Sequence, residues 1–219
     1  MTTTVRLAYG DDGLAIRVPD GTTVIAPRHR AAAADPLELL RRAVAAPVAG
    51  PPLREIVRPG QRVAISVCDI TRPQPREVML AAILEVLDGV IRPEDLVVLV
   101  ATGTHRANTR EELIAMLGVE VVTHCRVVNH DARDRSTLVD LGSVGDVPVW
   151  LNREWVEADV RITTGFVEPH FFAGFSGGPK MVAPGLAGLD TVLALHDARR
   201  IGDPRATWGI IEGNPVHDA

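Results

Sequence analysis

The chain opens with two short stretches in which apolar and polar residues alternate. They cover residues 4–9 and 14–18 and flank the sequence GDDG at residues 10–13. Alternation with a period of two is typical of a strand with one covered face, and glycine and aspartate favour tight turns. The pattern predicts an N-terminal β-hairpin. A helix is expected next, because Asp35 suits an N-cap and Pro36 suits the first helical position.

From residue 62 onward, continuous apolar runs alternate with helical patterns. The apolar runs predict strands over residues 62–67, 95–101, 126–128 and 158–165. Periodicity near 3.6 predicts helices over residues 76–89, 109–118 and 189–202. Strands that are apolar on both faces and alternate with helices indicate a parallel sheet covered by helices. We therefore predict an α/β fold with a mostly parallel sheet and helices on both faces.

Most chemically active side chains lie in the loops that follow these strands. The loops read CDITRPQP, TGTHRAN, NHD and GFVEPHFFAGFSGGPK. In open parallel sheets, ligands bind beyond the carboxyl ends of the strands. The clustering predicts an active site built from these four loops.

Composition narrows the choice of ligand. The formal charge is -5 and no block of basic residues is present, which argues against an electrostatic grip on nucleic acid. A small anion held by a few local cations is still compatible. The two cysteines, Cys68 and Cys125, lie in apolar runs and cannot form a disulfide framework. With no long apolar run and no signal-like order at the N-terminus, we expect a cytoplasmic protein without a membrane partner.

The first loop carries a carboxylate, a hydroxyl and a guanidinium in Asp69, Thr71 and Arg72. Arginine offers a planar fork to a carboxylate or phosphate, and aspartate accepts hydrogen bonds from ribose hydroxyls. The structural alternative is an Asp–Arg pair that fixes the loop while Pro73 starts the next helix. Both interpretations stay open at this point.

Two histidines follow different predicted strands. His105 lies in the turn TGTHR, and His170 lies in the corresponding place after a later strand. A single loop histidine is more often structural, but imidazole has a pKa of roughly 6.5 and suits proton transfer. Two histidines brought to one cleft are expected to act as a pair of bases. The other histidines are expected to be structural or exposed, namely His29, His124, His130 and His217.

The segment GFSGGPK at residues 174–180 invites comparison with a phosphate-binding loop. Its glycines favour close approach of a ligand. The P-loop template fails, because Pro179 precedes Lys180 and Met181 follows it. A nucleotide phosphate is still compatible with the backbone N–H groups of Ser176, Gly177 and Gly178. Lys180 itself is a phosphate partner, an exposed charge or a covalent attachment point, since a desolvated amine is a nucleophile.

His196 shares one face of the helix predicted over residues 189–202 with Leu189, Val192 and Leu193. A histidine on an apolar helix face is usually a core residue. If this face lines the cleft, neutral imidazole suits nickel, copper, zinc or iron. No second ligand stands at metal-binding spacing nearby, so a metal here needs other ligands from a cofactor.

Four of these motifs together resemble a known family. DITRP at residues 69–73, ATGTHR at 101–106, EPHFFAGFSGGPKMVAPGLAG at 168–188 and ALH at 194–196 are similar to the N-terminal domain of nickel-dependent lactate racemases and their relatives. The motifs occur in the same order and cover most of residues 52–216. The resemblance implies a Rossmann-like N-terminal domain of a two-domain enzyme.

The resemblance also implies a nickel pincer nucleotide, a pyridinium mononucleotide whose sulfur groups and one ring carbon hold nickel. Lys180 matches the lysine that forms a thioamide bond to the cofactor, and His196 matches the single protein ligand of nickel. His105 and His170 match the two catalytic bases. The resemblance places Asp69, Thr71 and Arg72 in a loop that binds the cofactor, with Arg72 also in the active site. It places Ser176, Gly177 and Gly178 near the nucleotide phosphate.

The expected function is racemisation or epimerisation of a short 2-hydroxy acid, with lactate as the expected substrate. Hydride would pass to and from the cofactor while each histidine serves one enantiomer. Two alternatives stay open: a nickel-nucleotide carrier without catalysis, and an ordinary nucleotide-phosphate-binding α/β protein. Residues 1–212 are expected to form the cofactor-binding and catalytic domain. Residues 213–219 would begin the connection to a second domain, with a helix starting at Asn214-Pro215; a homo-oligomer is compatible with all of this.

Overall fold

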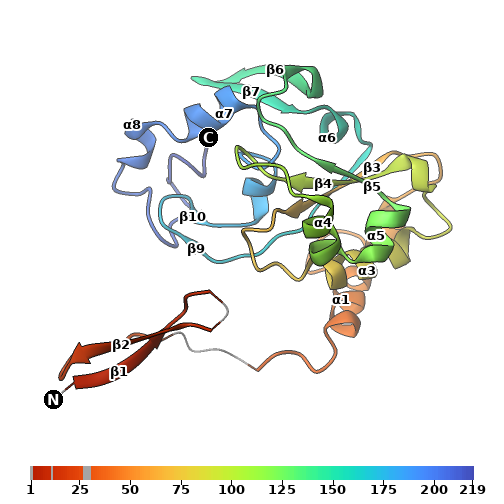
Figure 1. The fold of residues 1–219 in the computed structure, drawn as a ribbon. Helices are drawn as coiled ribbons and strands as arrows, with labels where there is room; N and C mark the ends of the chain where they lie inside the picture. The colour runs from red at the N-terminus through yellow and green to blue at the C-terminus, as the bar shows by residue number, and fades with distance from the viewer. Residues whose placement is uncertain (1, 11, 27–30) are drawn as a thin grey trace. The chain divides into compact units, whose positions relative to one another are not determined.

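The N-terminal unit is a β-hairpin, as predicted. The computed structural model describes residues 2–10, 12–26 and 31–219, and the chain divides into two compact units, residues 1–34 and 35–219. In the first, β1 (Thr2–Leu7) pairs antiparallel with β2 (Leu14–Pro19), and Val5 faces Ile16 across the pair (Figure 1). Asp11 of the expected turn and His29 lie outside the described residues.

The second unit is built on a four-stranded parallel sheet. Its strands are β3 (Val63–Cys68), β4 (Leu96–Ala101), β5 (Arg126–Asn129) and β8 (Val160–Thr163), in the spatial order β5-β4-β3-β8. The prediction of a mostly parallel sheet is confirmed. The order runs outward from β3 through β4 to β5 and then returns to the other side of β3. The switch point between β3 and β8 is where ligands bind in open sheets of this kind.

One face of the sheet is covered by three helices. These are α3 (Arg76–Leu87), α4 (Arg110–Leu117) and α5 (Val119–His124), which Figure 1 shows together on one side. Ile65 and Val98 from the sheet and Leu80 from α3 are fully buried in this core. Two further helices, α1 (Pro36–Ala45) and α2 (Leu53–Ile56), contact α3, and the Asp35 side chain caps α1 as expected.

The opposite face is covered mainly by short elements. Trp155 of α6 (Arg153–Glu157) and Leu186 pack on Ala64, Val97 and Leu99 of the sheet. Beside them lies an antiparallel hairpin, β6 (Leu138–Val144) and β7 (Val147–Asn152), which the sequence pattern did not reveal. Helices do lie on both faces, but the second face depends largely on loop and hairpin packing.

The last part of the chain departs from the prediction in two places. The single helix expected over residues 189–202 is wrong, since α7 (Leu189–Leu195) ends before His196 and α8 (Ala198–Ile201) starts anew with Asp197 as its N-cap. The helix expected at Asn214 is also wrong: the side-chain oxygen of Asn214 accepts the Val216 N–H in a turn. The remaining short elements are β9 (Pro169–His170), β10 (Gly174–Phe175), and the 3-10 turns η1 (Pro93–Asp95), η2 (Arg135–Thr137) and η3 (Gly178–Met181).

Two glycines of the 168–188 segment are explained by protein packing. Gly174 has φ of 77°, and a Cβ there would lie 2.2 Å from the carbonyl oxygen of Ile210. A Cβ on Gly185 would lie 2.8 Å from the carbonyl oxygens of both Lys180 and Met181. Such distances exclude a side chain, so at these positions glycine admits neighbouring backbone rather than a ligand.

Candidate active site

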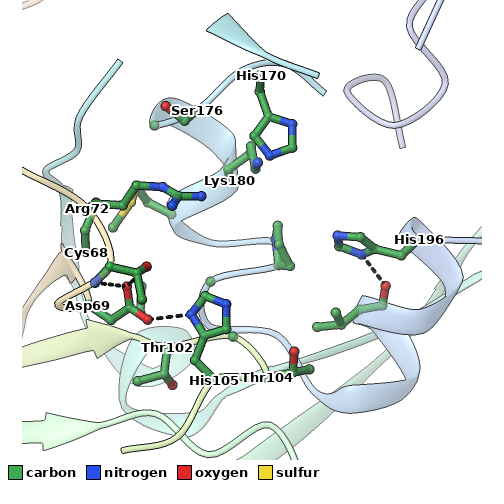
Figure 2. A pocket seen from close by; sticks show the side chains of 18 of the residues that line it. Cys68, Asp69, Arg72, Thr102, Thr104, His105, His170, Ser176, Lys180 and His196 are labelled. Carbon is green, nitrogen blue, oxygen red and sulfur yellow. Dashed lines mark hydrogen bonds and ion pairs between the residues drawn. The ribbon is translucent and has the colours of Figure 1, made fainter. Parts of the chain in front are cut away.

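A cleft of about 540 Å³ lies beyond the carboxyl ends of β3 and β4. The residues predicted for the site converge on it from separate loops, and Figure 2 shows their side chains around one open space. Nearly all of them line this cleft: Asp69, Thr71, Arg72, His105, His170, Ser176, Gly177, Lys180 and His196. Gly178 is the exception, since it is exposed and does not line the cleft. The predicted residues thus line one cleft at the strand ends, and their roles there stay predictions.

His105 is held by a buried carboxylate. Its Nδ1 lies 2.6 Å from Oδ2 of Asp69, whose side chain is only 6% exposed. The other oxygen of Asp69 accepts the N–H of Thr71 at 3.1 Å and its hydroxyl at 2.6 Å. Because the ionised carboxylate is an acceptor, it fixes the proton of His105 on Nδ1 and leaves the Nε2 lone pair free. Asp69 and Thr71 thus contact the histidine and each other.

The loop that carries Asp69 is shaped by two buried side chains behind it. The Arg76 guanidinium donates to the carbonyl oxygens of Cys68, Asp69, Arg72 and Gln74. The side-chain amide of Gln74 accepts the Cys68 N–H at 2.8 Å and donates to the Thr164 hydroxyl at 2.7 Å. Burial lowers the pKa of Arg76, yet the loop carbonyls satisfy its donors. These bonds fix the end of β3 relative to the end of β8.

Behind the His170 ring lie backbone N–H donors, where His105 has a carboxylate acceptor. Its Nδ1 accepts the backbone N–H groups of Phe172 at 3.5 Å and Ala173 at 3.3 Å, and its ring stacks on Phe171 at 4.8 Å between centroids. Burial, followed by the positive charges of Lys180 and Arg72, lowers the pKa of His170 to about 4. His170 is therefore a neutral imidazole near pH 7, with its proton on Nε2.

Lys180 is the only lysine in the sequence, although lysine and arginine together number 23. It lies on η3, and its ammonium is 5.8 Å from the centre of the Phe172 ring. Burial, with a further contribution from Arg72, lowers its pKa to about 8, while Glu168 opposes the shift. With a pKa of about 8, on the order of a tenth of Lys180 is uncharged at pH 7, far more than for an ordinary lysine, and this neutral amine is the form that reacts as a nucleophile.

His196 closes the helix α7 and faces the cleft. Its Nδ1 is 2.7 Å from the carbonyl oxygen of Val192, so Nδ1 carries the proton and Nε2 presents a free lone pair (Figure 2). A backbone carbonyl behind the distal nitrogen is the usual support of a metal-binding histidine. No group of three or more His, Cys, Asp or Glu side chains that could hold a metal occurs among the described residues. The side chain suits a single protein ligand of a metal whose other ligands come from a cofactor.

The polar groups of Ser176 already have partners. Its N–H donates to the carbonyl oxygen of Glu168 at 2.8 Å, and its hydroxyl donates to that of Phe166 at 2.7 Å. Ser176 holds the β9–β10 turn together, and no free donor of Ser176 supports a contact with phosphate. A phosphate at Gly177 or Gly178 stays a prediction.

Sequence reasoning overlooked several residues of the cleft. Cys68 lines its base, with Sγ 3.5 Å from Sδ of Met181, and burial raises the pKa of its thiol. Thr104 and Arg133 line the wall near His105. Arg133 follows the NHD loop, so the position of that loop at a strand end was the available signal. His130 of the same loop is buried and bonded to the Ala187 carbonyl at 2.9 Å, which confirms its structural role.

The charges of the cleft are mostly positive. Arg72, Arg133 and Lys180 line it, whereas Asp69 is its one acidic side chain and is bonded to His105 and Thr71. The protein as a whole carries a formal charge of -5. A cationic cleft in an acidic protein favours an anionic ligand. Elsewhere, no helix of the described chain has both the length and the apolar character needed to cross a membrane.

Comparison with known proteins is consistent across sequence and structure. The model of the lactate racemase N-terminal domain family matches residues 9–209. A lactate racemase from Thermoanaerobacterium thermosaccharolyticum is 32% identical over 218 residues, which cover 97% of this chain and 51% of that protein. A lactate racemase from Lactiplantibacillus plantarum is 36% identical over 183 residues, covering 82% and 43%. The chain thus spans about half the length of these relatives.

Solved structures give the same picture. The structure of the lactate racemase apoprotein from T. thermosaccharolyticum matches with a TM-score of 0.83 at 31% identity, covering 98% of this chain and 51% of that one. A crystal structure of a Thermotoga maritima protein matches with a TM-score of 0.66 at 23% identity, covering 84% and 44%, and shows a shared fold. The α/β architecture is therefore that of these proteins. On the family match over residues 9–209 and the identities above, the chain belongs to the lactate racemase N-terminal domain family.

Proposed function

We propose that this chain forms the cofactor-binding and catalytic part of an enzyme that racemises a short 2-hydroxy acid, with lactate as the substrate. The proposal rests on one observation: three side chains that differ in protonation and hydrogen bonding converge on one cleft. Lys180 offers a partly neutral amine, His196 a free Nε2 lone pair, and His105 a base backed by a carboxylate. The family supports the reaction, since its matched relatives carry the name lactate racemase.

The residues fit a nickel pincer nucleotide. Lys180 would form the covalent bond to the cofactor, because its lowered pKa makes the amine nucleophilic. His196 would ligate nickel through Nε2, because Nδ1 is bonded to the Val192 carbonyl. When bound, this cofactor supplies acceptance and return of a hydride at the substrate carbon. The protein supplies binding, orientation and proton transfer.

His105 would remove the hydroxyl proton of one enantiomer. Nε2 accepts the proton as the carbon–hydrogen bond is broken, and the resulting imidazolium keeps its Nδ1–H bond to Asp69. Asp69 is 4% exposed and its negative charge favours the imidazolium, while water screens part of this interaction because the His105 side chain is 55% exposed. Asp69 is therefore a positioning residue that also stabilises the charged base, which differs from its expected contact with the cofactor.

His170 would serve the other enantiomer from the opposite side of the cleft. With Nδ1 accepting two backbone N–H groups, its Nε2 carries a proton and is set as a donor in this state. To act as a base, His170 has to move that proton or lose those weak N–H contacts. Bonding of Lys180 to the cofactor would remove the Lys180 charge, which is the second cause, after burial, of the lowered pKa of His170.

Arg72 would bind the substrate carboxylate. It lines the cleft, and its only ion pair among the described residues is a long one, with Nε 3.9 Å from Glu168. A guanidinium that is weakly paired within the protein is available to an incoming carboxylate. This role positions the substrate between His105 and His170.

The test is to load the protein in cells that make a nickel pincer nucleotide and measure intact mass and metal content. Wild type should carry a covalent adduct and about one nickel per chain, as the proposal states. Lys180→Arg keeps the charge but should lose the adduct, whereas His196→Ala should keep the adduct and lose nickel. A matched control is His124→Ala, because His124 is an exposed histidine on α5 outside the cleft.

Lactate racemisation is then measured on the loaded wild type with both enantiomers. Adduct and nickel without turnover would favour a carrier module over an enzyme. Tight binding of ATP by the unloaded chain, with no adduct under any condition, would favour an ordinary nucleotide-binding protein and would overturn the proposal.

A further inference from the structure

The wall of the cleft beside His105 carries a second cationic group that the proposed chemistry does not use. Arg133 follows β5 in the loop after His130, and both Arg133 and Thr104 line the cleft. We propose that Arg133 and Thr104 form an oxyanion-binding subsite within this cleft. The inference rests on the proposed function for the identity of its ligand, but binding of an oxyanion is testable without turnover.

The position of Arg133 is fixed by backbone contacts. Its backbone N–H donates to the Asp131 side chain at 2.9 Å, and its Nη1 donates to the Thr104 carbonyl oxygen at 3.2 Å. The second bond holds the guanidinium against the residue whose hydroxyl also lines the cleft. Figure 2 shows Thr104 next to His105, on the side of the cleft from which His196 projects.

The guanidinium of Arg133 forms no ion pair with another described residue. Two other arginines near the site are firmly paired: Arg106 with Glu112 at 2.6 Å, and Arg135 with Asp190. No carboxylate among the described residues forms an ion pair with Arg133, and its one side-chain bond is to a neutral carbonyl. Most of the guanidinium donors therefore stay free for a ligand, and a fork of such donors matches a carboxylate or a phosphate.

A neighbouring hydroxyl completes the subsite. A threonine hydroxyl donates one hydrogen bond, and together with the guanidinium it provides donors from two loops to one oxyanion. Two ligands of the proposed reaction carry such a group, the 2-hydroxy acid through its carboxylate and the cofactor through its phosphate. Arg72 lies in the loop after β3 and Arg133 in the loop after β5, so the cleft offers two separate anion-binding positions for two anionic ligands.

The experiment titrates the cofactor-free 219-residue chain with two probes, followed by isothermal calorimetry and by shifts of backbone NMR signals. Nicotinamide mononucleotide carries a phosphate and no carboxylate, and lactate carries a carboxylate and no phosphate. Arg133→Gln should weaken binding of at least one probe by about tenfold or more, since charge-assisted hydrogen bonds are lost. Thr104→Val, which removes only the hydroxyl, should weaken the same probe by roughly threefold or more.

The matched control is Arg135→Gln, two residues away. Arg135 is exposed, its guanidinium carbon lies 4.0 Å from the centre of the Trp150 ring, and it does not line the cleft. This control changes net charge equally and should leave both affinities within about twofold of wild type. Arg133→Lys should restore part of the lost affinity, because the charge returns without the planar fork.

The probe that loses affinity identifies the ligand group. A loss confined to the mononucleotide assigns the subsite to the phosphate, and a loss confined to lactate assigns it to the substrate carboxylate. The inference is overturned if Arg133→Gln behaves like Arg135→Gln, or if neither probe binds the wild-type chain at tens of millimolar. Because no nickel is needed, these outcomes are separate from those of the adduct and racemisation assays.

Discussion

His105 and His170 face the same cleft with opposite groups behind their rings. A buried carboxylate stands behind Nδ1 of His105, whereas two backbone N–H groups and two nearby cations surround His170. The carboxylate stabilises an imidazolium, whereas burial of His170, the nearby cations and the N–H groups oppose one. Both histidines are expected to be bases. Before any ligand binds, however, the surroundings of His105 favour its protonated form and those of His170 oppose it.

The difference teaches that the groups hydrogen-bonded to Nδ1, and not the residue type alone, set which ring nitrogen of each histidine carries the proton. The carboxylate of Asp69 comes from the loop after β3 and reaches across to the loop after β4. The N–H groups behind His170 come from its own turn, only two and three residues later in the chain. His105 thus has a long-range carboxylate partner, whereas burial, followed by the charges of Lys180 and Arg72, lowers the pKa of His170 and keeps it neutral.

The largest expected effect comes from removing His105, the histidine that is hydrogen-bonded to Asp69. In the nickel-loaded protein, His105→Ala should lower kcat for lactate racemisation by about 10²–10⁴-fold, the usual contribution of general base catalysis. Asp69→Asn should lower kcat by roughly 10²-fold, because the amide no longer stabilises the imidazolium. Cofactor content, measured by intact mass, serves as the control and should not change. Wild-type turnover in Asp69→Asn would show that the carboxylate does not matter to the base.

A second test concerns the amine that lies beside His170. Lys180 should react with an acylating reagent at pH 8 roughly tenfold or more faster than an exposed lysine, because its pKa of about 8 leaves much of the amine neutral. Since the chain holds no other lysine, peptide mapping separates this site from the N-terminal amine alone. Reaction at the rate of a free lysine peptide would contradict the lowered pKa.

The third test measures the electrostatic coupling between Lys180 and His170. NMR titration should give His170 a pKa of about 4 in the ligand-free protein. Lys180→Met should raise that pKa toward the ordinary value while leaving it below, because burial is the larger cause and persists. Lys180→Arg keeps the charge and is the control. Equal pKa values of His170 in the Met variant and wild type would remove the proposed link between cofactor attachment and this base.

The smallest effect is on the pH dependence of stability. The pKa of His170 is lowered in the folded state, so the unfolded chain binds the proton more tightly. Stability should therefore fall as pH drops from about 6.5, the unfolded pKa, toward about 4. His170→Phe has no such titrating group, so this part of the loss is absent. Between pH 7 and 4.5 the free energy of unfolding of the variant should fall by ~1 kcal/mol less than that of wild type, after allowance for the partial exposure of His170. The free energy of unfolding is measured by urea denaturation at both pH values. An equal change between the two pH values in the variant and in wild type would contradict the prediction.

Much of the fold was accessible from the sequence because its signals are local. The strands β3 and β4 are continuous apolar runs, and Asp35 caps its helix as its side-chain chemistry suggests. The break at His196 was missed because α7 and α8 share a helical pattern, and only the Asp197 cap separates them. The β6–β7 hairpin was missed because its exposed residues give β6 little alternation.

The site shows the same division between local and distant information. Strand-end loops predicted which side chains meet, since the parallel sheet brings its carboxyl ends to one edge. The pairing of Asp69 with His105 depends on a contact between residues 36 positions apart, which no spacing rule reveals. For Ser176, the sequence suggested a phosphate donor, whereas folding of the β9–β10 turn uses both of its polar groups.

The buried amide of Gln74 has a consequence for substrate size. Its two ends join the Cys68 N–H to the Thr164 hydroxyl, and that hydroxyl continues to the Ser66 carbonyl at 2.7 Å. Buried hydrogen bonds therefore fix the spacing between the ends of β3 and β8 beneath the cleft. In the proposed reaction, selection among longer 2-hydroxy acids would then fall to the wall formed by α7, where Leu193 lines the cleft and is 59% exposed.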